Sequence, residues 1–140
     1  MKGQGKLPNV QIEGNEVIGR IRQGLDLLAL YHHHEVKNLD LIPSAGPLLI
    51  IINHSLATYD GFLLGKAIAE GTGRVPRGLG DDLLFKLPYV QDWCWEVGLV
   101  PASPRNALEL LERGEVVALA PGGMRESLRS SKDRYKVLWQ

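Results

Sequence analysis

Apolar residues recur along this 140-residue chain with two different spacings. From Glu16 to Tyr31 they follow the three- and four-residue spacing of one helix face, which predicts an amphipathic helix. The apolar stripe of this helix consists of Val17, Ile18, Ile21, Leu25 and Leu28. We expect the stripe to pack on the rest of the domain, with a role at a membrane surface as the alternative.

Short apolar runs later in the chain predict the strands of a buried sheet. Residues 48–52 carry no polar side chain, which is typical of a strand covered on both faces. Further strands are expected at 74–80, 97–100 and 115–120, helices at 61–70 and 104–113, and a short helical or irregular stretch at 83–88. Because strands and helices alternate, the sequence predicts an α/β fold with a mainly parallel or mixed sheet flanked by helices.

Turn and cap residues mark the ends of these elements. Pro43 and Pro47 bracket a turn before the first strand, because neither continues a helix. Ser103 followed by Pro104 provides an N-cap and a first-turn proline for the second of the two later helices, and Gly114 ends that helix.

Polar residues follow the strand at 48–52 and form the first candidate site. Asn53 and His54 come directly after the apolar run, and Asp60 follows His54 by six positions. An imidazole held by a carboxylate can remove a proton from a hydroxyl group near neutral pH. The alternative is structural: Asp60 would cap a helix that begins at Gly61, and His54 would donate to a backbone carbonyl.

A second candidate site follows the last predicted strand, where Pro121, Gly122 and Gly123 precede Arg125 and Glu126. Two successive glycines let the backbone approach a ligand closely and can turn amides toward an anion. Arg125 would add positive charge there. The alternative is a tight turn in which Arg125 and Glu126 are solvated.

The composition of the chain excludes some classes of binding partner. Sixteen Lys and Arg residues balance sixteen Asp and Glu residues, so no overall field draws the chain to nucleic acid or to anionic lipid. The single cysteine, Cys94, has no partner for an internal disulfide or a thiolate metal cage, and it fits a reducing compartment. No apolar stretch approaches the roughly 18 residues needed to span a bilayer. We therefore expect no nucleic-acid partner, no transmembrane segment in this chain, and a cytoplasmic location with membrane contact that is at most peripheral.

Three successive histidines, His32 to His34, raise the question of a metal site. Neighbouring residues on a helix project about 100° apart, so all three cannot face one ion. Acidic residues are scattered and there is no second cysteine, so we expect no metal. A metal protein built on this histidine cluster is the alternative.

These motifs together resemble the glycerolipid (phospholipid/glycerol) acyltransferase superfamily, and within it the diacylglycerol acyltransferase-like branch. The resemblance runs from about residue 35 to residue 139, and its motifs are His54 with Asp60, 85–88, 97–100, Arg105, 121–126 and 135–139. Five residues separate His54 from Asp60, where the phospholipid-making branch has four. Gly122 stands where that branch carries a glutamate. Both departures point to the diacylglycerol acyltransferase-like branch.

The resemblance implies transfer of a fatty acyl group from acyl-CoA, as co-substrate, to a hydroxyl of a glycerolipid or another lipid-like alcohol, with no cofactor. It implies that His54 is the general base and that Asp60 orients it. It also implies substrate-binding roles for Asn53, Arg105, Pro121, Gly122, Gly123, Arg125 and Glu126. A membrane surface is the third expected partner, beside acyl-CoA and the alcohol.

The same resemblance suggests how the chain is divided. Residues 1–34 would be a lead-in and the amphipathic helix, and residues 35–140 an acyltransferase domain. Domains of this family continue well beyond the position of Gln140, so we expect an incomplete domain, truncated at its C-terminus. The competing hypothesis is a catalytically inactive lipid- or partner-binding fragment of the same fold.

Overall fold

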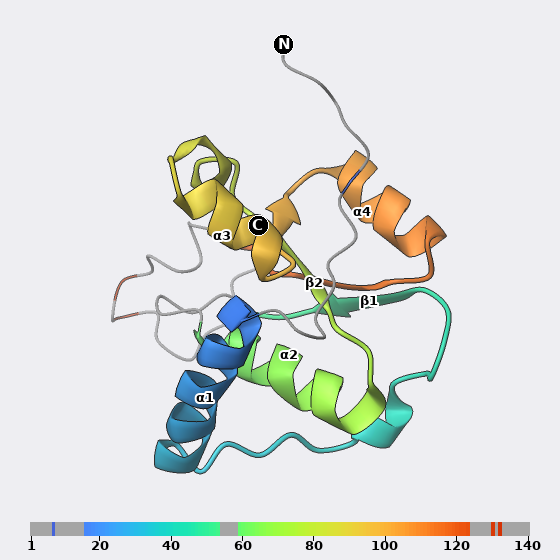
Figure 1. The fold of residues 1–140 in the computed structure, drawn as a ribbon. Helices are drawn as coiled ribbons and strands as arrows, with labels where there is room; N and C mark the ends of the chain where they lie inside the picture. The colour runs from blue at the N-terminus through green and yellow to red at the C-terminus, as the bar shows by residue number, and fades with distance from the viewer. Residues whose placement is uncertain (1–6, 8–15, 54–58, 124–129, 131, 133–140) are drawn as a thin grey trace.

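The computed structural model shows an α/β fold built on one parallel sheet (Figure 1). It describes residues 7, 16–53, 59–123, 130 and 132. The elements, in which η1 and η2 are 3₁₀ helices, are α1 (Glu16–Tyr31), η1 (Leu39–Leu41), β1 (Leu48–Ile51), α2 (Tyr59–Thr72), β2 (Arg77–Gly80), η2 (Leu84–Lys86), α3 (Val90–Glu96), β3 (Val100–Pro101), α4 (Pro104–Glu112) and β4 (Val116–Leu119). The predicted fold class is confirmed.

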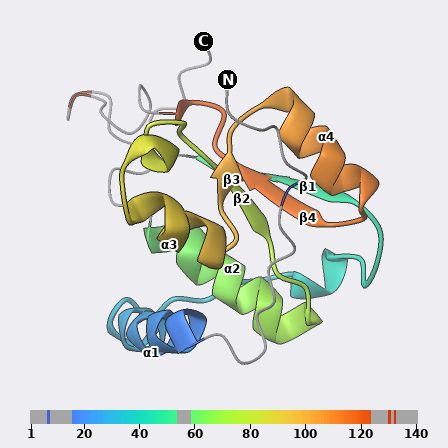
Figure 2. The same cartoon turned by 45° about the horizontal axis from the view of Figure 1, so that its top comes forward.

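The described strands lie in the order β1-β4-β2-β3, and every pair is parallel. The chain passes from β1 to β2 and on to β3, and then returns to β4 between β1 and β2. Because parallel crossovers are right-handed, the outward crossovers put α2 and α3 on one face of the sheet, and the return crossover puts α4 on the other. Figure 2 shows α4 on one side of the sheet and α1 stacked outside α2 on the opposite side.

Apolar side chains between the sheet and α4 form a core in which Val100, Leu110 and Val117 are fully buried. The N-terminus of α4 is capped as the sequence predicts, because the hydroxyl oxygen of Ser103 accepts a hydrogen bond from the backbone N–H of Asn106 at 3.1 Å. The cap at Ser103 and the burial of Leu110 therefore both stabilise α4.

α1 lies along α2 and is held there by ion pairs. Lys66 Nζ lies 2.8 Å from Asp26 Oδ1 and 2.7 Å from Glu70 Oε2, while Arg22 Nη2 lies 2.7 Å from Glu70 Oε1. Four residues of the predicted apolar stripe have described side chains, and all four are half-buried: Ile18, Ile21, Leu25 and Leu28. These burials support packing on the domain over a membrane-surface role for the stripe. The side chain of Val17 lies outside the described part of the chain.

α1 ends in a Schellman motif whose left-handed residue is His33 rather than the usual glycine. The backbone N–H of His34 donates to Ala29 O at 2.9 Å, that of His33 donates to Leu30 O at 3.2 Å, and His33 has a φ of 50°. The three histidines therefore follow the helix, and the helical-spacing argument against a metal site does not apply to them. Within the described residues, no group of three His, Cys, Asp or Glu side chains is placed to hold a metal ion.

Arg77 is buried at the amino end of β2, with 3% of its surface exposed. Its Nε donates to Gly98 O at 3.0 Å, and its Nη1 donates to Glu115 Oε2 at 3.1 Å. Burial lowers the pKa of the Arg77 guanidinium, and the negative charge of Glu115 opposes that shift. Because Gly98 precedes β3 and Glu115 precedes β4, this one side chain ties together the amino ends of three strands.

β1 differs from its prediction, because it is not covered on both faces. Leu49 is 43% exposed and Ile51 is 66% exposed. Leu49 is in register with Val117, which packs in the cluster of Leu110 from α4, so the exposed side chains lie on the α4 face. A helix is about 10 Å wide, or roughly two strand spacings, and α4 therefore does not reach the edge strand β1.

Residues 90–96, for which the sequence yields no predicted element, form α3. The C-cap of α3 is Val97, and Gly98 turns the chain with a φ of 85°. The strand predicted at 97–100 is consequently reduced to β3, which begins only at Val100.

Candidate active site

The two candidate sites predicted from the sequence lie at the ends of neighbouring strands. β1 and β4 pair in parallel with Ile51 in register with Leu119, and the backbone N–H of Ile52 extends the pairing by donating to Leu119 O at 3.0 Å. Adjacent strands are about 4.8 Å apart, so the segments that begin at Asn53 and Pro121 start side by side. This is the carboxyl edge of the sheet, where open α/β folds bind their ligands.

Asp60 lies in the first turn of α2, which begins at Tyr59 rather than at Gly61 as predicted. It is exposed, and its Oδ1 accepts a hydrogen bond from the backbone N–H of Gly61 at 3.0 Å. Asp60 is therefore inside the helix and is not its N-cap. His54 lies outside the described residues, and its pairing with Asp60 stays a prediction.

Pro121 and Gly122 form the corner of a tight turn after β4. The backbone N–H of Gly123 donates to Ala120 O at 3.1 Å, and Gly123 has a φ of 51°, which glycine adopts without strain. This hydrogen bond matches the tight-turn alternative for the segment. It also engages the Gly123 amide within the turn, so this amide is not directed at a bound anion.

Arg105 also lies at the carboxyl edge of the sheet, but it belongs to α4, which is on the face opposite α2 and α3. It is exposed in the first turn of α4, directly after β3. Because β2 separates β3 from β4, the ends of these two strands are about 10 Å apart. The structure therefore brings Asn53 and Pro121 together and places Arg105 farther away. Arg125 and Glu126 lie outside the described residues.

Aromatic contacts position the N-terminal turns of α2. The ring of His32 stacks on that of Tyr59, with centroids 5.3 Å apart and planes at 20°. Phe62 meets Trp93 of α3 with ring centroids 6.0 Å apart. The end of α1 and the middle of α3 therefore both contact the part of α2 that carries Asp60. Neither contact is predictable from the sequence, because each joins residues whose proximity depends on the tertiary fold.

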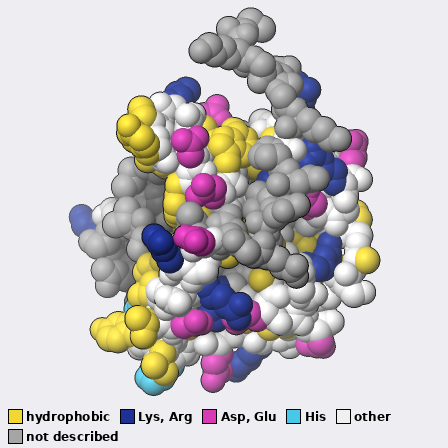
Figure 3. Space-filling model, viewed as in Figure 1, with side chains coloured by type: hydrophobic (Ala, Val, Ile, Leu, Met, Phe, Trp, Pro, Cys, Tyr) yellow, Lys and Arg dark blue, Asp and Glu magenta, His cyan; other side chains and the backbone are white. Residues whose placement is uncertain are grey.

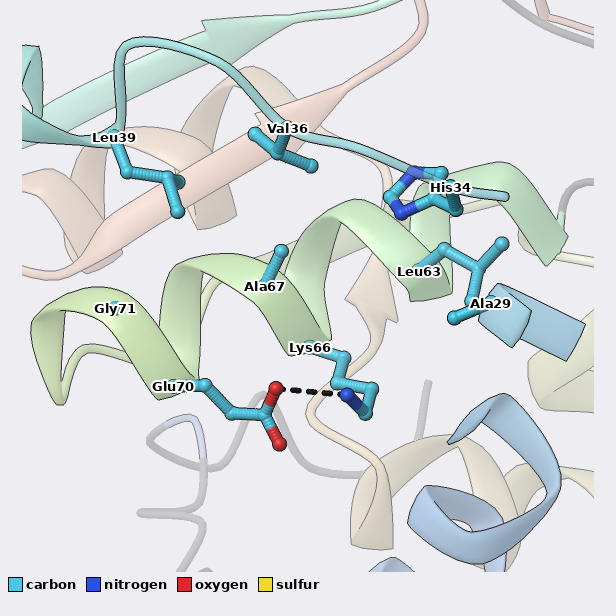
Figure 4. Close-up of a pocket in the computed structure, with 9 residues that line it drawn as sticks. All are labelled: Ala29, His34, Val36, Leu39, Leu63, Lys66, Ala67, Glu70 and Gly71. Atoms are coloured by element: carbon cyan, nitrogen blue, oxygen red, sulfur yellow. Dashed lines mark hydrogen bonds and ion pairs between the residues drawn. The ribbon is translucent and has the colours of Figure 1, made fainter. Parts of the chain in front are cut away.

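A cavity of ≈ 390 Å³ lies between the end of α1, the segment 34–39 and α2 (Figure 4). It is lined by Ala29, His34, Val36, Leu39, Leu63, Lys66, Ala67, Glu70 and Gly71. Hydrogen bonds to Asp26 and Glu70 raise the pKa of Lys66, so the amine is a cation held between two carboxylates. This cavity contains none of the site residues predicted from the sequence.

Cys94 is not placed to act as a nucleophile. It lies in α3 with 0% of its surface exposed, and burial raises the pKa of its thiol. A protonated, enclosed thiol is unreactive.

Comparison with known proteins identifies the family. Residues 33–136 match the model of the acyltransferase family, a span that includes both candidate sites and every strand of the sheet. The chain belongs to the acyltransferase family.

Similar proteins are longer than this chain. The protein named DGAT1/2-independent enzyme synthesizing storage lipids from Bos taurus is 33% identical over 112 residues, which cover 79% of this chain and 33% of that protein. The Homo sapiens protein of the same name is also 33% identical over 112 residues, covering 79% of this chain and 34% of that protein. Phytyl ester synthase 1, chloroplastic, from Arabidopsis thaliana is 27% identical over 134 residues, covering 89% of this chain and 19% of that protein. The chain thus spans about a third or less of these relatives. No solved structure matches it.

Proposed function

We propose that this chain forms part of an O-acyltransferase that moves a fatty acyl group from acyl-CoA to the hydroxyl of a glycerolipid or another lipid-like alcohol. Membership of the acyltransferase family supports the reaction class, and so do relatives named for storage lipids and phytyl esters. The observation that carries the proposal is the register of β1 with β4. It sets Asn53 beside the start of the turn at residues 120–123, within the span that matches the family.

In the proposed mechanism His54 is the general base. Its imidazole takes the proton of the acceptor hydroxyl as that oxygen attacks the thioester carbonyl carbon, while Asp60 fixes the imidazole tautomer and stabilises the imidazolium. When the tetrahedral intermediate collapses, the C–S bond breaks and the new ester remains. CoA leaves as a thiolate that takes the proton from the imidazolium. No acyl-enzyme is needed, which fits the burial of Cys94.

The acceptor we propose is neutral, such as a mono- or diacylglycerol or a long-chain alcohol, rather than glycerol 3-phosphate or lysophosphatidic acid. Gly122 is exposed in its turn and supplies no carboxylate, which leaves room for a bulkier and less polar alcohol. The names of the bovine and plant relatives support the same choice. Arg125 argues for a phosphorylated acceptor, because a guanidinium beside glycines is a competent phosphate ligand.

Thioester turnover by the purified chain tests the reaction. The assay follows release of the CoA thiol and formation of the ester from acyl-CoA and diacylglycerol. His54→Ala should lower turnover by about 10² to 10⁴-fold, the usual contribution of a general base, and leave the melting temperature almost unchanged. His33→Ala is the matched control and should keep full turnover. Near-wild-type turnover by His54→Ala would remove His54 from the role of base.

A competition assay tests the acceptor. Diacylglycerol and lysophosphatidic acid are offered together with one acyl-CoA, and we expect the diacylglycerol product to dominate. A strong preference for lysophosphatidic acid that disappears in Arg125→Ala would overturn the neutral acceptor and leave the acyl-transfer proposal in place.

A catalytically inactive lipid- or partner-binding fragment is the second candidate function. It is compatible with the family match over residues 33–136, because that match shows the family and not turnover. Binding of diacylglycerol without thioester turnover by the purified chain would support it. Turnover that depends on His54 would exclude it.

We also propose that the protein binds lipid surfaces peripherally, because a water-insoluble acceptor resides in a membrane or a lipid droplet. Among the described residues, no helix is long and apolar enough to cross a bilayer. The half-buried stripe of α1 is not available for such contact without disturbing the packing on α2, so a different surface must meet the lipid.

A further inference from the structure

Two groups of exposed apolar side chains lie near the carboxyl edge of the sheet. The first, the α1 group, consists of Leu27, Leu30 and Tyr31, which are 70%, 73% and 79% exposed. The second, the η2 group, consists of Leu83, Leu87 and Tyr89, which are 61%, 43% and 87% exposed. Single exposed apolar residues are normal, but clusters of large ones mark surfaces that bind something.

Each group lies in a segment that leads to an aromatic contact with the first turns of α2. The α1 group directly precedes His32, whose ring stacks on Tyr59, and the η2 group precedes Trp93, whose ring meets Phe62. Figure 3 shows hydrophobic side chains protruding at the upper left and at the lower left, where Figure 1 draws the η2–α3 region and the end of α1. In Figure 1 the chain runs through β1 toward this same side, so the two groups flank the carboxyl edge.

Tyr89 is held in a backbone conformation that bulky residues rarely adopt. Its φ is 65° and its ψ is −35°. Its side chain is 87% exposed, so side-chain packing does not hold this conformation; a hydrogen bond from the Val90 N–H to Pro88 O at 2.8 Å closes the turn around it. Strained backbone concentrates at functional positions. A tyrosine, with an apolar ring and a polar tip, is suited to the boundary between lipid and water.

The charges beside the η2 group define which lipid surface fits. Asp81, Asp82, Asp92 and Glu96 are exposed in this segment, together with the single basic residue Lys86. Four acidic residues and one basic residue give residues 81–96 a net charge of −3, which repels anionic headgroups. Neutral and zwitterionic lipids carry no such penalty and accept the leucines and the tyrosine equally well.

We propose that the α1 group and the η2 group together form a docking surface for neutral or zwitterionic lipid, which brings the carboxyl edge of the sheet against the layer that holds the acceptor. The choice of occupant rests on the proposed function, whereas the choice of surface rests on exposure, position and charge. A lipid layer contacts two separated groups at once, because a fluid layer needs no matching shape.

Vesicle sedimentation of the full chain tests the docking surface. With phosphatidylcholine vesicles, the double variant Leu30→Asn/Leu83→Asn should lose about tenfold or more in binding, because two leucines no longer enter the apolar layer. Leu108→Asn is the matched control, since Leu108 is 60% exposed but lies on α4 across the sheet, and its binding should equal wild type. Far-ultraviolet circular dichroism of all variants should be identical. Equal vesicle binding by the double variant and by wild type would overturn the proposal.

Two further measurements separate lipid docking from electrostatic adsorption and from self-association. Adding phosphatidylserine to the vesicles should not strengthen binding, and salt should not weaken it; strong binding only to anionic vesicles would overturn the proposal. Analytical ultracentrifugation tests for a second copy as occupant. If Leu83→Asn abolishes self-association and leaves vesicle binding intact, the surface is a protein interface and the proposal fails.

Vesicle binding is measured without turnover, so the docking surface and the proposed function succeed or fail separately. A chain that binds phosphatidylcholine through Leu30 and Leu83 but shows no thioester turnover supports the surface and removes the acyltransferase proposal. Conversely, thioester turnover together with unchanged vesicle binding by the double variant supports the acyltransferase proposal and removes the docking surface.

Discussion

Glu115→Ala should destabilise the fold strongly although Glu115 itself is not buried. The change leaves the Arg77 cation, 3% exposed, without the carboxylate that lies 3.1 Å from its Nη1. Removing one partner of a buried ion pair costs about 3 to 5 kcal/mol. Because 25% of the Glu115 side chain is exposed and Arg77 keeps its bond to Gly98 O, we expect a loss at or just below the lower limit of this range, about 2 to 3 kcal/mol. For a domain of this size that corresponds to a fall in melting temperature of about 10 °C.

Urea denaturation and thermal melting measure this effect in four variants: Glu115→Ala, Glu115→Gln, Arg77→Met and the double variant Arg77→Met/Glu115→Ala. Glu115→Gln retains a hydrogen-bond acceptor for Arg77 and should lose less than half as much stability as Glu115→Ala. The double variant Arg77→Met/Glu115→Ala should be more stable than Glu115→Ala alone, because it contains no buried cation that has lost the Glu115 carboxylate. Thioester turnover per folded molecule should be unchanged, since the pair lies at the amino edge of the sheet.

A melting temperature of Glu115→Ala within about 2 °C of wild type would show that Arg77 does not depend on this carboxylate. The same reasoning would be refuted if the stability losses of Arg77→Met and Glu115→Ala added up to the loss of the double variant. Such additivity would mean that the two side chains do not interact, and that the 3.1 Å contact contributes nothing to stability.

Three other substitutions test local features. A hydrogen bond from Lys66 lowers the pKa of Glu70, so this contact stabilises the fold above the ordinary carboxyl pKa and is lost as pH falls through the lowered one. In urea titrations the destabilisation by Glu70→Gln should be full at neutral pH and should disappear as pH falls below the lowered carboxyl pKa, and a constant difference across pH would contradict this. Ser103→Ala should cost about 1 kcal/mol in thermal melts because the N–H of Asn106 loses its acceptor, and an unchanged melt would mean that the cap is ineffective. His33→Gly should raise stability by about 0.5 to 1 kcal/mol, since glycine adopts a φ of 50° without strain, and a lower melting temperature would refute that reasoning.

α4 is predictable from its sequence because its limits depend on local chemistry. Ser103 caps the N-terminus, Pro104 occupies the first turn and Gly114 takes a φ of 75° after the last turn. Each of these residues acts on its immediate neighbours, so no knowledge of the fold is needed. The same holds for α1, whose limits at Glu16 and Tyr31 follow from its apolar spacing.

α3 is not predictable because its helical residues depend on tertiary contacts. It is seven residues long, and its N-cap is Tyr89, which has an unfavourable positive φ and makes no side-chain capping bond. On this short helix Trp93 contacts Phe62, which is distant in sequence, and Cys94 is fully buried. The burial of Arg77 is unpredictable for the same reason, because a lone arginine in an expected strand gives no sign that Glu115 will face it.

The candidate site is predictable in its parts and only partly in its arrangement. The residues after two apolar strands, from Asn53 and from Pro121, are the natural candidates because parallel strands end at one edge of the sheet. That these two strands are adjacent does not follow from the sequence, since the chain visits β2 and β3 before it inserts β4 next to β1. Arg105 shows the consequence. It follows a strand as the other candidates do, but that strand, β3, is two positions from β4 in the sheet.

The two edges of the sheet hold their polar groups in different ways, and this difference separates stability from chemistry. At the amino edge Arg74 donates to Pro43 O at 2.7 Å and to Gly114 O at 2.9 Å, which ties the segments before β1 and β4 to the one before β2. Together with the bonds of the buried Arg77, these bonds fix the amino ends of the strands. The register of the strands at the carboxyl edge is therefore set without contacts from the loops at that edge. The carboxyl edge can then carry an exposed carboxylate, a tight glycine turn and exposed apolar side chains that add little to folding. Substitutions at the amino edge should accordingly change melting temperature far more than turnover per folded molecule, and those at the carboxyl edge should do the opposite.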